Sequence, residues 1–545
     1  MGATTLWTRA QVAARILNGD TLIVYHGHLL SIPQKWLDAH PGGSLAFLHF
    51  VGRDATDEIE ANHQDHTLPL IPKYSIGRVE LTDGIWEPFL PPISTGWVRR
   101  PGAAGKLEWY KEAAGVYSSQ NQHSEFFPSS SVLLVESDPS QPKASGPTLA
   151  SLKPPPSTLS LKEQARQSKA YRELHKHIIE AGLYKTRYIT GYGPEILRYT
   201  LIASLSIYFY VHDWLITSAV FLGLLWHQLV FTAHDLGHMG VTHNWTIDRL
   251  IAITIADFIG GLSIGWWVNN HNVHHLVTNH PSHDPDIEHI PFFAISPAFL
   301  DSLWSSYYKR TMKFDRFAKL ALSVQHKLFY LVMAFGRFNL YVNSYTYLYN
   351  KAFDTKRARG GYWAWRMEVL GIFFFWTWYG TVLYGCGSWQ MALAYLLVSH
   401  AVTSPLHVQI VLSHFSMPTG DLGPTESFPH RQMRTTTDVV CAPPAEFIHG
   451  GLHLQVTHHL FPRLPRHNLR RASELVKRFA KEEGLVYAEF GFVEGNREVI
   501  GTLRAVAEQV RIMGRVASAE VEEAVEKKMK ATDVMLGLDG NGVRS

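Results

Sequence analysis

The sequence predicts an α+β domain at the N-terminus, followed by an all-α integral-membrane domain with about four transmembrane helices. Within residues 1–97, a strand-like run at 21–25, a turn at 26–28 and short helical pieces such as 34–39 follow one another, as in a compact mixed domain. Apolar runs of membrane length begin only after residue 195. A Pro/Ser-rich stretch separates the two parts, so we expect two domains joined by a linker.

The composition excludes several classes of protein. The 545 residues carry a formal net charge of +3, so no basic field indicates nucleic acid as a partner. Two cysteines cannot build a disulfide framework or a cysteine-based metal site, and they fit a cytosol-facing environment. No long apolar run follows Arg9 and Arg15, so no secretory signal is expected. Histidine is the unusual residue: there are 30, many in tight clusters, which directs attention to imidazole chemistry.

Residues 98–160 are predicted to form a disordered linker. Proline and serine are concentrated at 128–131, 137–147 and 154–156, and such a stretch cannot bury enough apolar surface to fold alone. Residues 491–545 are charged and helix-prone without a run long enough to span, which predicts a helical tail. The membrane domain is therefore predicted at 161–490, beginning with a charged amphipathic helix.

Four apolar runs in this domain have the length needed to cross about 30 Å of hydrocarbon. They form two predicted hairpins, at 196–211 with 214–233 and at 369–384 with 390–411. Two further oily segments, 247–268 and 329–349, contain charged or amide side chains and are predicted to be interfacial or re-entrant. Lysine and arginine precede both hairpins, so the positive-inside rule places both entrances on the cytosolic side.

A histidine pair in the first domain points to a haem. His40-Pro41-Gly42-Gly43 is followed by Asp54-Ala55-Thr56 and then by His63. Two imidazoles on one haem iron leave no open position, so such a site transfers electrons and does not bind oxygen. A glycine turn after the first histidine lets the backbone approach a flat ligand closely. Taken alone, the tetrapeptide His40-Pro41-Gly42-Gly43 could equally be a surface histidine before an ordinary turn.

The surrounding residues favour the haem. Residues 5–82 resemble the cytochrome b5 family, including the Asp54-Ala55-Thr56 element ahead of the second histidine. The resemblance implies the b5 fold and a bis-histidine haem b with His40 and His63 as axial ligands. His66 and His49 are competitors for the second position, and the distance of His63 from Asp54-Ala55-Thr56 matches the family pattern.

Three histidine clusters lie in the membrane domain, at 234–238, 271–275 and 455–459. Their members are three or four residues apart, so on a helix they share one face, and several imidazoles around two irons can activate oxygen. A single pair of histidines with this spacing more often packs against other side chains than binds a metal. Polar side chains beside membrane runs cost free energy, however, so three such clusters indicate a functional site. A zinc peptidase is excluded because Asp235 stands where its motif needs glutamate.

The patterns HxxxH, HxxHH and QxxHH resemble the membrane fatty-acid desaturase family over residues 160–490. The third box begins with glutamine and the chain carries a fused b5 domain, and in both respects it resembles the front-end branch of this family. The residues around the boxes are also similar to that branch: 450–452, 460–467, Asn279 and 284–286. Val456-Thr457 departs from the branch, where Ile-Glu is common. The resemblance implies two non-haem irons held by these residues: His234, His238, His271, His274, His275, His414, His458 and His459, with Gln455 as a weak or water-mediated contact.

Nearby residues have other expected roles. Asp235, Asp284 and Asp286 are candidates to orient the imidazoles by accepting their second N–H groups. Histidines without a motif match are left out of the ligand set: His280, His283, His289, His449, His453 and His467. His467 is expected at the membrane surface together with Arg463 and Arg466.

The resemblance implies an oxygen-dependent lipid desaturase, with O2 as co-substrate and electrons entering from NADH-cytochrome b5 reductase. The protein would lie in the endoplasmic reticulum membrane with both metal sites facing the cytosol. A lipid hydroxylase is the nearest alternative enzyme. A non-enzymatic haem carrier or metal-handling membrane protein is an alternative of another class, against which the three ordered boxes argue.

The substrate is suggested only by resemblance. The long Pro/Ser linker and the sequence as a whole are similar to fungal sphingolipid delta-8 desaturases, which implies the long-chain base of a ceramide as substrate. An acyl-lipid front-end desaturase of the delta-5 or delta-6 type is the alternative. Residues 281–303 are candidates to contact the polar head of the lipid.

Overall fold

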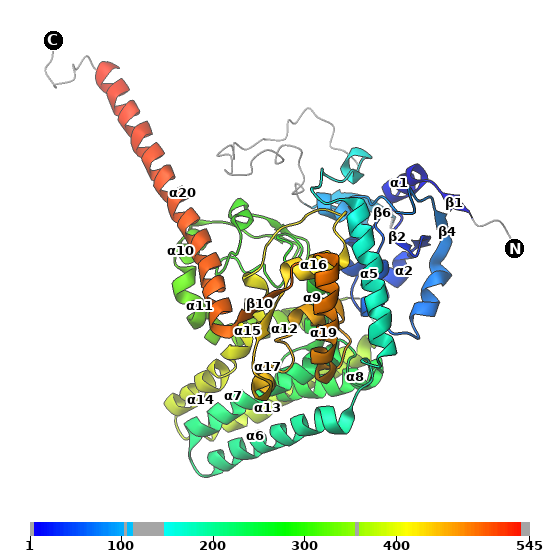
Figure 1. The fold of residues 1–545 in the computed structure, drawn as a ribbon. Coiled ribbons are helices and arrows are strands. Elements are labelled where there is room, and N and C mark those ends of the chain that lie inside the picture. Colours follow the sequence, from blue (N-terminus) through cyan, green and yellow to red (C-terminus); the bar gives the residue numbers. More distant parts are fainter. Residues whose placement is uncertain (1–4, 103–105, 113–145, 355–358, 536–545) are drawn as a thin grey trace.

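The computed structural model describes residues 5–102, 106–112, 146–354 and 359–535, with side chains up to residue 529 at the C-terminal end. The N-terminal domain is an α+β unit around a four-stranded sheet of order β1-β4-β3-β2 (Figure 1). The strands are β1 (Leu6–Trp7), β2 (Leu22–Tyr25), β3 (His28–Ser31) and β4 (Ser75–Val79). Helices α1 (Arg9–Leu17), α2 (Gln34–Ala39), α3 (Leu45–Leu48) and α4 (Thr56–Asn62) pack around it.

The local signals in this domain are confirmed. Strands β2 and β3 form an antiparallel hairpin whose two turn residues, His26 and Gly27, both have positive φ. That turn type matches the twist of a hairpin, and glycine at its second position carries no steric cost. The helix expected at 34–39 is α2.

The range predicted to be a linker contains regular structure at its start. Strands β5 (Trp97–Pro101) and β6 (Leu107–Lys111) pair antiparallel, and the Trp109 indole donates to the carbonyl of Leu17 at 2.9 Å. Leu152, in a short 3-10 helix, is completely buried in the core of the N-terminal domain. Trp109 and Leu152 are two apolar residues in a largely polar stretch and hardly change its average composition. The composition therefore predicts a linker over the whole range. The Pro/Ser-rich residues 128–131 and most of 137–147 lie outside the described residues.

The second domain is almost entirely helical. Its long apolar helices are α6 (Gly193–Val211), α7 (Leu215–Gly237), α13 (Gly361–Tyr384) and α14 (Trp389–Ala401), the last continued by α15 (Ser404–Phe415). Figure 1 shows α6, α7, α13 and α14 lying together at one end of the molecule. The buried aromatic side chains of α7, α13 and α14 form one core cluster, with Trp226, Tyr379 and Tyr395 among its members.

The prediction of four spans is not confirmed. Among the described residues, two helical segments are long and apolar enough to cross a membrane, Leu215–Gly237 and Trp389–Phe415. A third is the pair Trp245–Ile259 and Ile264–Leu276, bent by 113°, which has the shape of a broken span or a re-entrant segment. Helix α13 is rich in Trp and Tyr and contains Arg366 and Glu368, and α6 contains Glu195 and Arg198, so both are less apolar than their length suggests.

A layer of shorter elements covers the ends of the long helices. It contains α5 (Leu161–Glu180), α8 (Trp245–Ile253), α9 (Ile264–Leu276), α16 (Phe428–Thr435), α18 (Gln455–Leu460) and α19 (Arg466–Glu483). The Tyr171 hydroxyl of α5 donates to the carbonyl of Leu460 at 2.7 Å, which fixes the end of α18. The predicted C-terminal tail is the helix α20 (Phe492–Met535); Val499 and Leu503 near its start are completely buried, and its outer part projects from the body (Figure 1).

Candidate haem and di-iron sites

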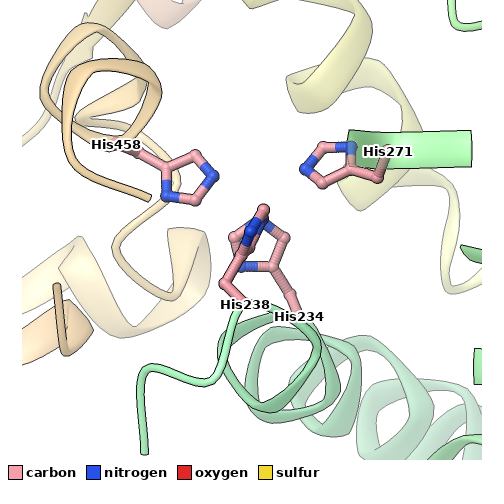
Figure 2. A group of neighbouring side chains, drawn as sticks. All are labelled: His234, His238, His271 and His458. Carbon is pink, nitrogen blue, oxygen red and sulfur yellow. The ribbon is translucent and has the colours of Figure 1, made fainter. Parts of the chain in front are cut away.

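The first metal group is formed by all three histidine boxes. His234 and His238 lie at the C-terminal end of α7, His271 lies on α9 and His458 lies on α18. One ligand atom from each of the four lies within 4.8 Å of those of the others, and Figure 2 shows the four rings pointing toward one centre. Residues 234 and 458 are far apart in sequence, so the fold must bring these histidines together. Packing of two histidines on a single helix does not explain the arrangement.

A second group lies beside the first. His274, His414 and His459 bring their ligand atoms within 4.8 Å of one another, and all three are buried. His414 is near the end of α15, which continues a candidate membrane span. The residue that the sequence suggested only through family resemblance is therefore in contact with the box histidines.

His275 lies between the two groups. Its Nε2 is 3.1 Å from Nε2 of His271 and 3.2 Å from Nε2 of His458, and its ring stacks on that of His459. All eight predicted histidines are thus gathered at one site. Gln455 begins α18, and its buried Oε1 has no hydrogen-bond partner among the described residues.

The donor set fits metal ions. Nε2 of His238 and Nε2 of His459 are buried and also lack a hydrogen-bond partner among the described residues. Native proteins rarely leave buried polar atoms unpaired, so these nitrogens indicate a ligand. Burial, followed by the neighbouring histidines, holds the pKa of His458 and of His459 well below the ordinary value. Both rings are therefore neutral at physiological pH, the form that coordinates a metal.

Carboxylates orient the imidazoles as the sequence predicts. Nδ1 of His274 lies 2.9 Å from Asp284, and Nδ1 of His271 lies 3.4 Å from Asp286. His234 lies 3.3 Å from Asp235 in the same way. A bond at Nδ1 fixes the tautomer and leaves Nε2 for the metal. Asp286 also lies 3.8 Å from Nδ1 of His274, so one carboxylate is near the Nδ1 atoms of both rings.

Two supporting residues are not predicted by the sequence. Gln432 on α16 is completely buried; its Oε1 accepts from Nδ1 of His459 at 3.0 Å, and its Nε2 donates to the carbonyl of His275 at 2.7 Å. Arg466 donates from Nε to Asp235 at 2.7 Å. Neither residue belongs to a histidine motif; Arg466 follows the last box closely, but Gln432 precedes it by 23 residues, so the sequence gives no signal for Gln432.

The expectation that Arg463 and Arg466 lie at the membrane surface is wrong. Arg463 is 5% exposed and Arg466 9% exposed, because each has a partner inside the protein. His467 is half-buried and accepts a hydrogen bond from the backbone N–H of Arg187. None of the six histidines that the ligand set leaves out takes part in a metal group of the described residues.

The haem residues face each other across a cavity. The ring centroids of His40 and His63 are 6.0 Å apart, in a cavity of about 480 Å³ whose walls include Phe47 and Ile59. Nδ1 of His63 lies 2.8 Å from the carbonyl of Ile59, and Nδ1 of His40 lies 3.3 Å from that of Gly43, so both Nε2 atoms remain for a metal. Burial and then His63 lower the pKa of His40 to about 3, so this ring is neutral.

The competing histidines do not line this cavity. The ring of His49 lies 4.6 Å from that of His283, on the side of the domain that contacts the second domain. Neither His49 nor His66 is among the residues that form the cavity. The geometry therefore fits a flat, apolar cofactor between His40 and His63.

Comparison with known proteins agrees with this geometry. Residues 213–491 match the model of the fatty acid desaturase family, and residues 8–80 match that of the cytochrome b5-like heme/steroid binding domain. A delta 8-(E)-sphingolipid desaturase of Emericella nidulans is 42% identical, covering 95% of this chain and 98% of the relative. One of Komagataella phaffii is 42% identical, covering 93% and 94%. A delta(8)-fatty-acid desaturase of Arabidopsis thaliana is 36% identical over 63% of this chain and 76% of its own. This chain belongs to the fatty acid desaturase family and carries a cytochrome b5-like domain at its N-terminus.

Proposed function

We propose that this protein introduces a double bond at the delta-8 position of the long-chain base of a sphingolipid, with ceramide as substrate. The convergence of eight histidines into two adjacent groups supports the desaturase chemistry. The similarity to fungal delta 8-(E)-sphingolipid desaturases over nearly the whole chain supports the substrate.

The balanced reaction consumes one O2, two electrons and two protons. The substrate loses one hydrogen from each of two neighbouring methylenes, a double bond forms between them, and two molecules of water result. Two irons held by the histidine groups would activate O2 as the oxidant, because side-chain acid–base chemistry cannot break an unactivated C–H bond. The chain itself holds the imidazoles through Asp284, Gln432 and Asp235 and excludes water by burial.

A haem b held by His40 and His63 would supply the electrons one at a time. We propose NADH-cytochrome b5 reductase as the donor to this haem. Fusion supports this role because a tethered donor has a high effective concentration at its acceptor. With this assignment, residues 1–97 form the haem domain, 98–160 a connector, 161–490 the desaturase domain and 491–545 the helical tail.

We further propose that the protein resides in the endoplasmic reticulum with both sites on the cytosolic side. Helices α7 and α15 both end at metal-group histidines, so both have their C-terminal ends at the metal site. Helices α6 and α13 pair with them as hairpins and begin beside basic residues, as the positive-inside rule requires of a cytosolic entrance. The polar head of the substrate would lie at this leaflet, beside residues 281–303.

Expression in a yeast that makes saturated long-chain bases tests the proposal. Hydrolysed long-chain bases should gain a delta-8 double bond, while the fatty-acid profile stays unchanged. A His458→Ala variant at the same expression level is the control and should give no product. New unsaturation confined to fatty acids would identify an acyl-lipid front-end desaturase instead, and a hydroxylated base would identify a hydroxylase.

A further inference from the structure

The turn that carries the first haem histidine packs on the helix of the second box. A Cβ added to Gly43 would lie 3.0 Å from Oδ1 of Asn269, and one added to Gly42 would lie 3.6 Å from Nδ2 of Asn272. Both asparagines lie on α9, on either side of His271. The glycine turn therefore allows the close approach of two domains as well as that of a flat cofactor.

The segment that carries the second haem histidine contacts the residues that follow the first and third boxes. Nε2 of Gln64, the residue after His63, donates to the carbonyl of His243 at 2.7 Å. His243 belongs to the loop that leaves the first box. On the other side of His63, the carbonyl of Ala61 accepts from Nε of Arg463 at 3.3 Å.

Arg463 connects the third box to the segment of the second haem histidine. It follows the third box by four residues and reaches a carbonyl two residues before His63. The same side chain lines the cavity that contains His63, Gln64 and His238. Its guanidinium also lies over the ring of Tyr184, at 5.0 Å from the centroid, which limits its freedom.

The surrounding contacts make this a built interface. Gln64 is 7% exposed, so its hydrogen bond is shielded from water. At the far end of α4, buried Asp57 forms an ion pair of 2.8 Å with the partly exposed Arg172 of α5. Arg53, also buried, donates to the carbonyl of Glu426 ahead of α16. A buried cation without its partner carries a large penalty, so these contacts define one docked position.

We propose that Arg463 is a positioning residue that holds the His63 segment against the third histidine box, and that electrons leave the haem domain across this contact. The proposal rests on the proposed function only in that the electrons are used for desaturation. It predicts that the docked position is the productive one, so weakening it slows electron delivery without affecting entry of electrons into the haem.

The test compares full-length Arg463→Gln and Arg463→Lys with the wild type, with Arg471→Gln as a control at an exposed position of α19. Arg463→Gln should leave haem reduction by the reductase unchanged and slow re-oxidation of the reduced haem, under O2 and lipid substrate, at least tenfold. Backbone amides of residues 56–63 should lose protection in hydrogen exchange. Lysine keeps the charge and one donor, so it should restore most of both properties, and Arg471→Gln should match the wild type.

A second variant separates docking from folding. Gln64→Leu removes the other hydrogen bond beside His63 without removing a charge, and it should also slow haem re-oxidation and expose residues 56–63 to exchange. Wild-type re-oxidation and exchange in both Arg463→Gln and Gln64→Leu would overturn the proposal. If the wild-type protein makes no sphingolipid product, the proposed function fails. Hydrogen exchange needs no lipid substrate, so it still tests whether Arg463 and Gln64 hold the His63 segment in place.

Discussion

Gln432 binds His459 through one end of its amide and the backbone of His275 through the other. Oε1 accepts from Nδ1 of His459 at 3.0 Å, and Nε2 donates to the carbonyl of His275 at 2.7 Å. One buried side chain, outside every histidine box, therefore fixes the second box relative to the third. Hydrogen bonds of this kind set the tautomer and the ring orientation of a metal-binding histidine.

Replacing Gln432 by leucine should reduce iron affinity or activity roughly 10- to 100-fold, the range typical of such supporting residues. The leucine side chain fills the space but leaves Nδ1 of His459 and the carbonyl of His275 with only the Thr278 hydroxyl, which lies 3.5 Å from each. Iron content per protein and turnover measure the effect. Gln167→Leu, another buried glutamine but on α5, is the control. Normal iron content in Gln432→Leu would show that the histidines hold their orientation without it.

The haem and the irons should be separable by mutation. His40→Ala or His63→Ala should abolish a six-coordinate, low-spin haem spectrum and leave the non-haem iron in place. His275→Ala or His458→Ala should do the reverse. The full-length protein is the right sample because Trp109 and Leu152, beyond residue 100, contact the N-terminal domain. A normal haem spectrum in both His40→Ala and His63→Ala would refute the ligand assignment.

The buried carboxyl of Asp57, which pairs with Arg172, should make stability depend on pH. Burial raises the pKa of Asp57 to about 6, against the opposing charge of Arg172. The folded protein therefore binds this proton between about pH 4 and pH 6 while the unfolded chain does not, so stability falls as pH rises through this window. Asp57→Asn keeps a side-chain oxygen for Arg172 and removes the effect.

The melting temperature of Asp57→Asn should consequently exceed that of the wild type at pH 8, by the equivalent of about 3 kcal/mol at most, since one pKa unit corresponds to about 1.4 kcal/mol. The difference should shrink toward pH 4.5. Asp20→Asn breaks the more exposed ion pair with Arg15 and serves as the control. Parallel melting curves for Asp57→Asn and the wild type from pH 4.5 to pH 8 would contradict this account.

The sequence predicts what is local and misses what is distant. Histidines three or four residues apart on one helix are visible in the sequence, and so is the turn at His26 and Gly27. The carboxylates that orient these histidines lie close to the boxes and are also visible, but the residues that come from distant segments are not. Arg466 contacts Asp235 across 231 residues, and nothing near Arg466 in the sequence indicates an internal partner. For the same reason, Arg463 is expected at a surface although Ala61 holds it inside the protein.

Asn279 should be required for the second metal group, to which His414 belongs. Its backbone has φ +56, a conformation that asparagine adopts more readily than most residues, and its completely buried amide donates to the carbonyl of His414 at 2.9 Å and to that of Pro418 at 3.3 Å. Asn279→Ala removes these hydrogen bonds and adds backbone strain, whereas Asn279→Gly removes only the hydrogen bonds.

Both variants should therefore lose iron, because His414 is held less firmly. The alanine variant should also be about 1 kcal/mol less stable than the glycine variant, which is the scale of left-handed backbone strain for an ordinary residue. Iron content and melting temperature of the two purified variants separate the two effects. Equal melting temperatures would show that the backbone relaxes at this position. Full iron content in Asn279→Gly would mean that the carbonyl contacts are dispensable, and that Thr435, whose carbonyl lies 3.2 Å from Nδ1 of His414, suffices to orient that ring.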